Sequence, residues 1–321
     1  VVLSPRRPIT AAPYALYAKS APWSGLAGVP AGFADGVDNT SAYVRTVVVS
    51  PVGTDLQNGT ALRNALEGIT TASPTNRYLL KIEPGTYDLG TFSPGNPPLR
   101  MKPYVDIEGS GELATKITGT SPGGGAVEGA NWTELRFLTV EVRGSGGAIF
   151  NNSVSARLTH VTITALGTTG SVTGVYNNGP LTMNDVTIDV SGSFDGAGVR
   201  NNSQSLSMDS VTINLSGSGN ANIGLENNYT FPYALLNDVT IKVYGAAFNM
   251  GIITGTGGGR VEVHHSAITI LGTGSSLQNA SGSFIDVGAS QVAGPVDNQG
   301  SVTCAASYSR DYRQLKPDCT P

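Results

Sequence analysis

The sequence predicts an all-β fold, a right-handed parallel β-helix with three short strands per coil and a short N-terminal capping helix. A unit of 24 to 27 residues repeats from residue 157 onward, and polar turns separate its three apolar segments. The segments lack helical periodicity, so no crossover helix fits between them. In the recurring Val-Thr-Ile segment, alternation along a strand points Val and Ile inward and Thr outward. Stacked coils of this kind bury one continuous apolar column.

Length and composition fit an elongated domain with appendages. The chain has 321 residues, and only 13% of them are charged. A net charge of -4 with no basic stripe argues against a nucleic-acid partner. No apolar run is long enough for a membrane span.

Three regions follow from these patterns. Residues 1–42 form an extended arm or connector rich in Ala, Pro and Gly, and residues 43–300 form the parallel β-helix. A helix near 55–69 caps it with a face made by Leu56, Leu62, Ala65, Leu66 and Ile69. Residues 301–321 form a tail that a Cys304–Cys319 disulfide closes, with two unrelated free thiols as the alternative. A disulfide predicts an oxidising compartment, so we expect a secreted, extracellular or cell-surface protein.

Polar columns recur at the bends and on the outer faces. The asparagines at one bend predict a structural ladder of side-chain amides, because asparagine tolerates left-handed turns and can bond to its neighbour one coil above. A second bend carries Thr159, Asn184, Asp209, Asn237 and Ser266. The asparagine column contains Asn151, Asn177, Asn201, Asn227 and Asn279.

An outward threonine column follows one face of the predicted solenoid. Strand propensity explains it best, because threonine packs well on a pleated surface. A flat docking face for another subunit, a carbohydrate surface and an ice-ordering surface are the alternatives. The column contains Thr139, Thr162, Thr187, Thr212, Thr240 and Thr269.

Over residues 43 to 300 the chain resembles the pectate-lyase-like superfamily of β-helices. The resemblance lies in the order of VSPVGTD, a capping helix, KIEPGTYDL, YVDIEGSG and TKITG. The opening segment is similar to a connector of secreted bacterial proteins with tail-fibre-like architecture, and the Cys-bounded tail is similar to the ending of that group. This resemblance implies export and an upstream domain, and it does not specify a reaction.

The family's catalytic patterns are not recognisable in this sequence. Lyases of the family need an acidic calcium cluster with an Arg or Lys base, and the hydrolases need several Asp on adjacent coils. Glu141, Asp189 and Lys242 are weak catalytic candidates in one outward column, while Asp106 and Glu108 are expected to be simply exposed. No metal site and no cofactor are expected, because the three histidines lack ligand spacing.

The favoured function is therefore a non-enzymatic structural or adhesive subunit of a secreted fibre or cell-surface assembly. A polysaccharide lyase or glycoside hydrolase is the first alternative, and a non-catalytic carbohydrate-binding module is the second. An enzyme should bring several carboxylates and a base together in one groove, and the acidic residues between positions 134 and 290 form no cluster. The expected partner is another copy of the chain, in a homo-oligomer or filament, docked through Tyr14, Tyr17, Trp23 and Phe33 of the arm. An arm packed back on its own coils is the alternative, and a polysaccharide is the other candidate partner.

Overall fold

The computed structural model describes residues 43–93, 96–152, 154–202, 205–228 and 232–321. The expected docking residues Tyr14, Tyr17, Trp23 and Phe33 lie outside these ranges, as does the tail-fibre-like connector. Arg45–Pro321 form one compact unit.

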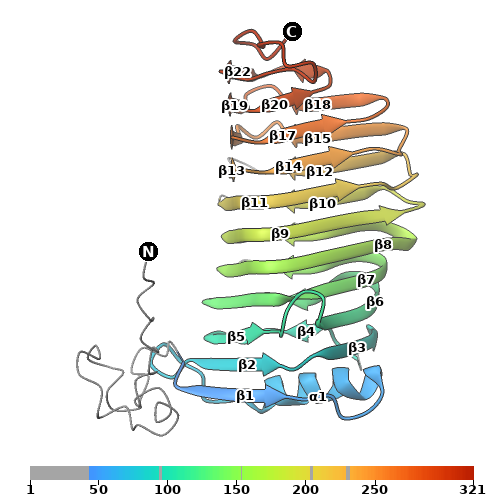
Figure 1. Ribbon diagram of the computed structural model, residues 1–321, viewed down its shortest axis with the longest axis vertical. Coiled ribbons are helices and arrows are strands. Elements are labelled where there is room, and N and C mark those ends of the chain that lie inside the picture. Colours follow the sequence, from blue (N-terminus) through green and yellow to red (C-terminus); the bar gives the residue numbers. More distant parts are fainter. Residues whose placement is uncertain (1–42, 94–95, 153, 203–204, 229–231) are drawn as a thin grey trace, which may run out of the picture. The chain divides into compact units, whose positions relative to one another are not determined.

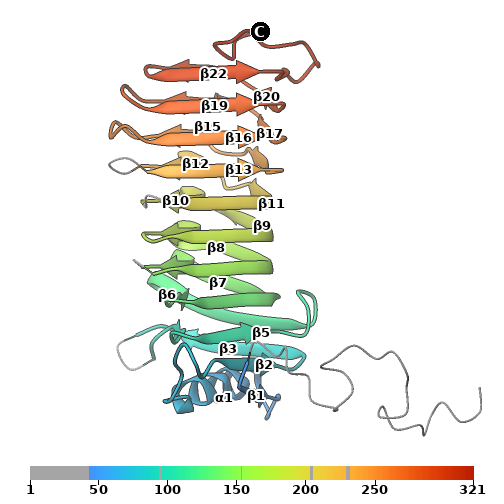
Figure 2. The same ribbon diagram turned by 90° about the vertical axis from the view of Figure 1, so that its left-hand side faces the viewer.

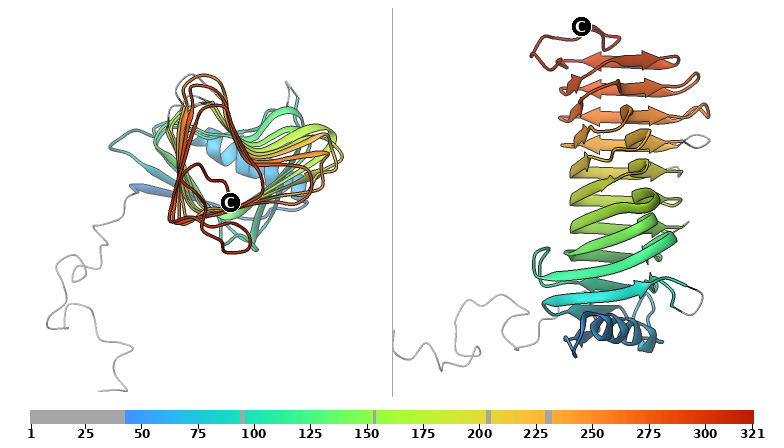
Figure 3. Two further views of the ribbon diagram at one scale, coloured as in Figure 1. Left: turned by 90° about the horizontal axis from the view of Figure 1, so that it is seen from above. Right: turned by 90° about the vertical axis from the view of Figure 1, so that its right-hand side faces the viewer.

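This unit is a solenoid of parallel strands, as the sequence predicts (Figures 1 and 2). The chain turns through three faces in every coil, and strands of successive coils pair in parallel. Seen along its axis, the coil is roughly triangular (Figure 3). The described residues contain 22 strands and one helix.

The first face runs the whole length of the solenoid. Its strands alternate inward apolar and outward polar side chains, as in β2 and β9. The face is made by β1 (Arg45–Val49), β2 (Tyr78–Ile82), β5 (Val105–Glu108), the starts of β7 (Thr133–Asn151), β8 (Ala156–Asn177), β9 (Leu181–Gly192) and β11 (Leu206–Leu215), and then β13 (Tyr233–Asn237), β16 (Arg260–His264), β19 (Phe284–Gly288) and β22 (Ser301–Ala305).

The second face follows the first in each coil. Long strands pass into it around a single bend, so one strand can serve two faces. The face is made by β3 (Gly85–Thr91), the start of β6 (Thr115–Glu128), the central parts of β7 and β8, the ends of β9 and β11, and then β14 (Thr240–Val243), β17 (Ala267–Ile270) and β20 (Gln291–Ala293).

The third face closes each coil and leads to the asparagine bend. It is made by β4 (Leu99–Arg100), the ends of β6, β7 and β8, and then β10 (Gly196–Asn201), β12 (Ala221–Asn227), β15 (Phe248–Thr254), β18 (Gly274–Asn279) and β21 (Val296–Asn298).

Three asparagines at the bend after the third face form the ladder that their spacing predicts. Asn151, Asn177 and Asn201 each donate from Nδ2 to Oδ1 of the next asparagine, at 2.7, 2.8 and 2.7 Å. Thr254 follows Asn227 and donates to Asn279 at 2.7 Å, so the column continues through a hydroxyl. All of these side chains are buried, and the ladder supplies most of their hydrogen-bond partners. Oδ1 of Asn151 and Nδ2 of Asn227 have no partner among the described residues.

In the coils that carry the ladder, the recurring non-glycine residues of left-handed conformation lie at the other bend, between the first and second faces. No asparagine of the ladder has a positive φ, so the expectation that the ladder sits in left-handed turns is wrong. One residue per coil bends the chain there with φ between 48° and 57°: Phe137, His160, Asp185, Ser210, Asp238, His265, Ala289 and Ala306.

Serines continue this bend in the last coils. Ser266 is buried, and its backbone N–H donates to Oγ of Ser290 at 3.0 Å. Its assignment to the outward bend column after Asn237 is therefore wrong. The residue in register with Asn237 is His264. Ser266 lies two residues later, at the inward position that Val239 holds one coil earlier.

Both ends of the apolar column are covered. Helix α1 (Asp55–Gly68) packs Leu62 and Leu66 into the core. Leu56, expected on this face, is 54% exposed, because Asn58 and Gly59 face β3 in its place.

At the other end, the tail crosses the last coil (Figure 3). Leu315 and Cys319 are buried against the core, and Cys304 and Cys319 form the predicted disulfide with a Cα–Cα distance of 5.1 Å. No helix in the described ranges is long and apolar enough to cross a membrane.

Candidate functional site

Two columns of outward side chains run along the second face, and strand register defines their members. The first, which we call the threonine column, contains Thr86, Lys116, Thr139, Thr162, Thr187, Thr212, Thr240 and Ala267. The second, which we call the carboxylate column, contains Asp88, Thr118, Glu141, Thr164, Asp189, Asn214, Lys242 and Thr269.

This register corrects one member of the predicted threonine column. Thr269 pairs with Lys242 and belongs to the carboxylate column, and Ala267 pairs with Thr240 in its place. The error has the same cause as that at Ser266, since aligning Ala-Ile-Thr-Ile on Val-Thr-Ile displaces the last coil by two residues.

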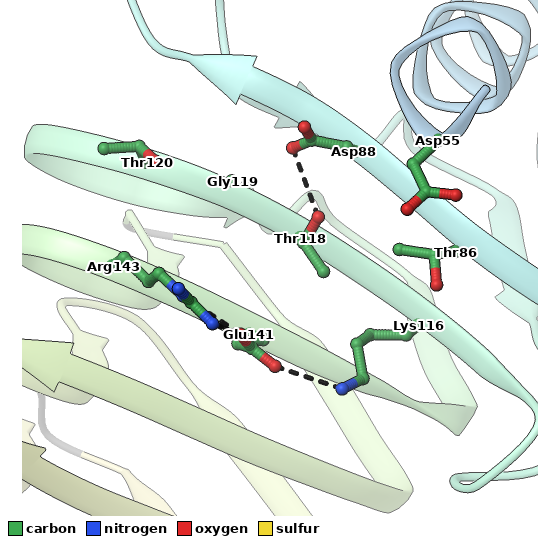
Figure 4. A pocket seen from close by; sticks show the side chains of 9 residues that line it. All are labelled: Asp55, Thr86, Asp88, Lys116, Thr118, Gly119, Thr120, Glu141 and Arg143. Carbon is green, nitrogen blue, oxygen red and sulfur yellow. Dashed lines mark hydrogen bonds and ion pairs between the residues drawn. The ribbon is translucent and has the colours of Figure 1, made fainter.

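The first coils of the second face and the start of α1 border an open groove of about 420 Å³, which we call the carboxylate groove (Figure 4). Its side chains come from α1, β3, β6 and β7, which lie side by side. The lining residues are Asp55, Thr86, Asp88, Lys116, Thr118, Gly119, Thr120, Glu141 and Arg143.

Asp55 reaches the groove because the start of α1 is fixed against β3. The helix begins with a capping box in which Thr54 and Gln57 bond to each other's backbone N–H groups. Buried Asn58 accepts from the backbone N–H of Val52 at 2.7 Å and donates to the carbonyl of Thr86 at 3.0 Å. The first turn of the helix is thereby tied to the strand that carries Asp88.

Gly59 permits this close approach. A Cβ at this position would lie 1.9 Å from the carbonyl oxygen of Asp88. Any larger residue would push the helix away from β3, and Asp55 would move with it.

Glu141 is held between two cations. Lys116 Nζ lies 3.1 Å from one carboxylate oxygen, and Arg143 Nη2 lies 3.0 Å from the other. Burial by itself raises the pKa of Glu141, but hydrogen bonds from Lys116 and Arg143 outweigh it and lower the pKa below its ordinary value. Glu141 is therefore ionised at neutral pH.

Asp88 has neutral hydrogen-bond donors. Its Oδ1 accepts from the Thr118 hydroxyl at 3.1 Å and from the backbone N–H of Gly90 at 2.9 Å. Thr118 stands between Asp88 and Glu141 in the carboxylate column, so the two acids are two strands apart. Their Cα atoms are therefore about 9 to 10 Å apart.

The three weak candidates from the sequence are not brought together. Glu141 lines the groove, whereas Asp189 lies two coils further along and accepts from Asn214 at 2.9 Å. Lys242 lies beyond it, with Nζ 5.5 Å from the ring centre of Tyr244. Of the three, Glu141 alone lines the groove.

Asp55, Asp88, Lys116 and Arg143 were missed. For Asp88 and Lys116 the signal lay in the motifs KIEPGTYDL and TKITG, whose outward threonine, aspartate and lysine lie on adjacent strands.

Asp106 and Glu108, expected to be simply exposed, are ion-paired. Asp106 is buried and pairs with Arg77 at 3.0 Å, and Glu108 pairs with Lys81 and with Arg136 at 2.7 Å. In the described part of the chain, no three His, Cys, Asp or Glu side chains are grouped closely enough to hold a metal ion.

Comparisons with known proteins give likeness in structure alone. No family model matches the sequence, and no curated protein matches it significantly. The A-module of the mannuronan C-5 epimerase AlgE6 from Azotobacter vinelandii is 13% identical, with 82% of this chain and 87% of that one covered and a TM-score of 0.44.

Two further solved structures are similar. A rice weevil pectin methyl esterase is 13% identical, with 98% of this chain and 91% of that one covered and a TM-score of 0.42. The catalytic domain of a GH87 alpha-1,3-glucanase is 10% identical, with 83% of this chain and 64% of that one covered and a TM-score of 0.36. The named activities belong to those proteins, and the predicted parallel β-helix is confirmed by the strand pairing of this structure.

Proposed function

We propose that this protein is a glycoside hydrolase of the β-helix type that cleaves a neutral polysaccharide in the carboxylate groove. The observation that carries this proposal is the meeting of Asp55, Asp88 and Glu141 in one open groove. Hydrolysis of a glycosidic bond needs a pair of carboxyl groups that flank it, whereas an adhesive solenoid needs no such pair.

The two carboxyl groups of the carboxylate column have different surroundings, and this suggests their roles. Both hydrogen bonds that Asp88 accepts from neutral donors reach Oδ1, which leaves Oδ2 to face the oxygen of the glycosidic bond as the general acid. Glu141 is kept ionised by Lys116 and Arg143, so it can accept a proton from the water that attacks the anomeric carbon. Asp55 faces the same space from α1 and would hydrogen-bond the sugar hydroxyls.

The spacing of the pair favours an inverting mechanism. A separation of two strands is about 9 to 10 Å at the backbone, near the upper end of the range of roughly 6.5 to 9.5 Å used by inverting enzymes. A retaining mechanism needs carboxyl groups only about 5 Å apart, which fits adjacent strands. Thr118 occupies that adjacent position.

The charges of the groove favour a hydrolase over a lyase that acts on acidic sugars. Elimination from a uronic acid requires a cation that binds the sugar carboxylate. In this groove Lys116 and Arg143 both pair with Glu141, and the carboxylates outnumber the cations. We therefore expect no turnover of polygalacturonate, with or without calcium.

This proposal replaces the structural or adhesive role that the sequence favoured. That preference depended on finding no cluster of acidic residues between positions 134 and 290. Asp55 and Asp88 lie before that interval, and only Glu141 lies within it. The disulfide supports an extracellular setting, where polysaccharide substrates occur.

Release of reducing ends from β-glucan, xylan, mannan and α-glucan tests the proposal. We expect one of these neutral polysaccharides to be cleaved, and Asp88→Asn and Glu141→Gln each to lose about 10²- to 10⁴-fold in rate. Asp189→Asn is the matched control, because Asp189 shares the carboxylate column but lies outside the groove.

Two results would overturn the proposal. The first is that none of the four polysaccharides releases reducing ends. The second is that Glu141→Gln stays as active as the wild type while Asp189→Asn loses activity. Binding without cleavage would identify a carbohydrate-binding module.

A further inference from the structure

The bend that joins the third face to the first carries an exposed tryptophan in an unusual conformation. Trp132 has φ of 61° and is 59% exposed. A bulky residue pays a steric cost in the left-handed region, and such strain concentrates at functional positions. The residue is more than half exposed, so burial offsets only part of this cost.

Contacts from the next coil and from two coils earlier hold the Trp132 backbone. Its N–H donates to the carbonyl of Ser155 at 2.9 Å, and its carbonyl accepts from Arg77 Nη2 at 3.2 Å. Arg77 is fixed in turn by the buried carboxylate of Asp106, which also accepts from the backbone N–H of Glu134 at 2.7 Å. The indole is thus presented from a firmly held backbone.

A groove of about 330 Å³ begins at the indole and follows the bend along later coils. The bend carries Tyr104 and Trp132 in earlier coils, and Ser155, Pro180 and Ser205 line the groove in later ones. Trp132 borders this groove together with these smaller residues. We call this space the tryptophan groove.

Hydrogen-bonding side chains border the floor of the tryptophan groove. Glu134, Arg157 and Thr182 follow one another in register along the first face. The Arg157 side chain is 61% exposed, and its Nη2 lies 3.9 Å from Glu134. With Arg77 and Asp106 included, cations and carboxylates balance, so the groove favours a neutral ligand.

We propose that the tryptophan groove binds a neutral pyranose unit of an oligosaccharide. The apolar C–H face of a pyranose ring stacks on the indole, while its hydroxyls bond to Glu134, Arg157 and Thr182. The site lies at the bend between the third and first faces, whereas the carboxylate groove lies on the second face. The two grooves have no lining residue in common. It serves to hold the chain and takes no part in cleavage.

Tryptophan fluorescence tests this binding in the full-length chain. The sequence contains Trp23 and Trp132 alone, so Trp23→Phe leaves Trp132 as the single reporter. Neutral hexaoses of glucose, mannose and N-acetylglucosamine are titrated as probes. We expect a saturable emission change with at least one of them.

Calorimetry with the hexaose that responds then compares the affinity of each variant with that of the wild type. Trp132→Gly removes the ring but tolerates the left-handed backbone, and we expect at least ~10-fold weaker binding. Trp132→Tyr retains a ring and should recover part of the affinity. Phe248→Ala is the matched control, because Phe248 is also 59% exposed and lies outside the tryptophan groove.

No emission change with any hexaose would overturn the proposal, as would equal binding by Trp132→Gly and the wild type. The titration needs no turnover, so it stands or fails separately from the hydrolysis proposed above.

Discussion

The early coils and the later coils of this solenoid are stabilised on their surfaces by different means. Fewer ion pairs link the described later coils, where uncharged ladders of asparagine, serine and threonine repeat from coil to coil. The early coils carry the pairs Arg77–Asp106, Lys81–Glu108, Arg136–Glu108, Arg136–Glu134, Arg100–Glu128, Lys116–Glu141 and Arg143–Glu141.

This difference separates architecture from function. A repeated side chain bonds to its own copy one coil away, so a ladder specifies stacking and little else. Both proposed grooves lie in the first half of the unit, where unlike side chains occupy equivalent positions. Asp88, Thr118 and Glu141 follow one another in one column there, and Trp132 gives way to Ser155 in another.

The largest expected effect is at the C-terminal end, where a covalent bond holds the cap. Cys319→Ser removes a cross-link that closes a loop of 15 residues, and we expect about 3 kcal/mol less stability toward denaturant. Reduction of the wild type should reproduce the loss. A variant as stable as the wild type would show that the tail caps the core without the bond.

At the N-terminal end, packing holds the cap. Gly59→Ala places a Cβ against the Asp88 carbonyl, and we expect a loss of about 1 to 3 kcal/mol together with weakened hydrolysis. Gly68→Ala is the control on the same helix, since a Cβ there meets nothing within 4 Å. Equal melting temperatures for the two variants would contradict the close approach of α1 to β3.

The later coils can be tested at their ladder. Asn201→Leu leaves the amides of Asn177 and Asn227 without one partner each, and we expect a loss of about 1 to 3 kcal/mol. Asn214→Leu is the control, because Asn214 is half-buried on the outer surface and should change stability by about 0.5 kcal/mol or less. Thermal unfolding of both variants measures the difference.

Acidification should produce the smallest loss of stability among these tests. We expect the early coils to lose stability before the later coils do. Burial raises the pKa values of Glu108, Glu134 and Glu141, but hydrogen bonds from partners such as Lys81, Thr159 and Lys116 outweigh it and lower them. A lowered folded-state pKa gives stability that is complete above the unfolded value of about 4.3 and is lost as pH falls through the folded value.

Hydrogen exchange on acidification measures this regional difference. Amides of β5 and β6 should lose protection at a higher pH than amides of β11 and β14. Simultaneous loss in both regions would contradict the comparison.

The sequence predicted the later coils well because each repeat can be aligned on the repeat before it. The alignment failed where Ser266 replaces a valine at the inward bend, and Thr269 was misplaced in consequence. A serine satisfies that bend by hydrogen bonding along its own ladder, which an apolar pattern does not reveal.

The carboxylate groove could not be assembled from the sequence. Its first residues lie before the repeat begins, where no second copy fixes the register. The pairing of β3 with β6 is irregular between Asp88 and Thr91, and the position of Asp55 depends on a contact between Gly59 and β3. The spacing of residues along the chain reveals neither the irregular pairing of β3 with β6 nor the contact between Gly59 and β3.

The anomeric configuration of the first product tests the assignment of Asp88 and Glu141 most directly. Proton NMR during cleavage of the responding polysaccharide shows which anomer forms before mutarotation. Two carboxyl groups two strands apart predict inversion at the anomeric carbon. Retention of configuration would contradict this account, because it requires a pair about 5 Å apart.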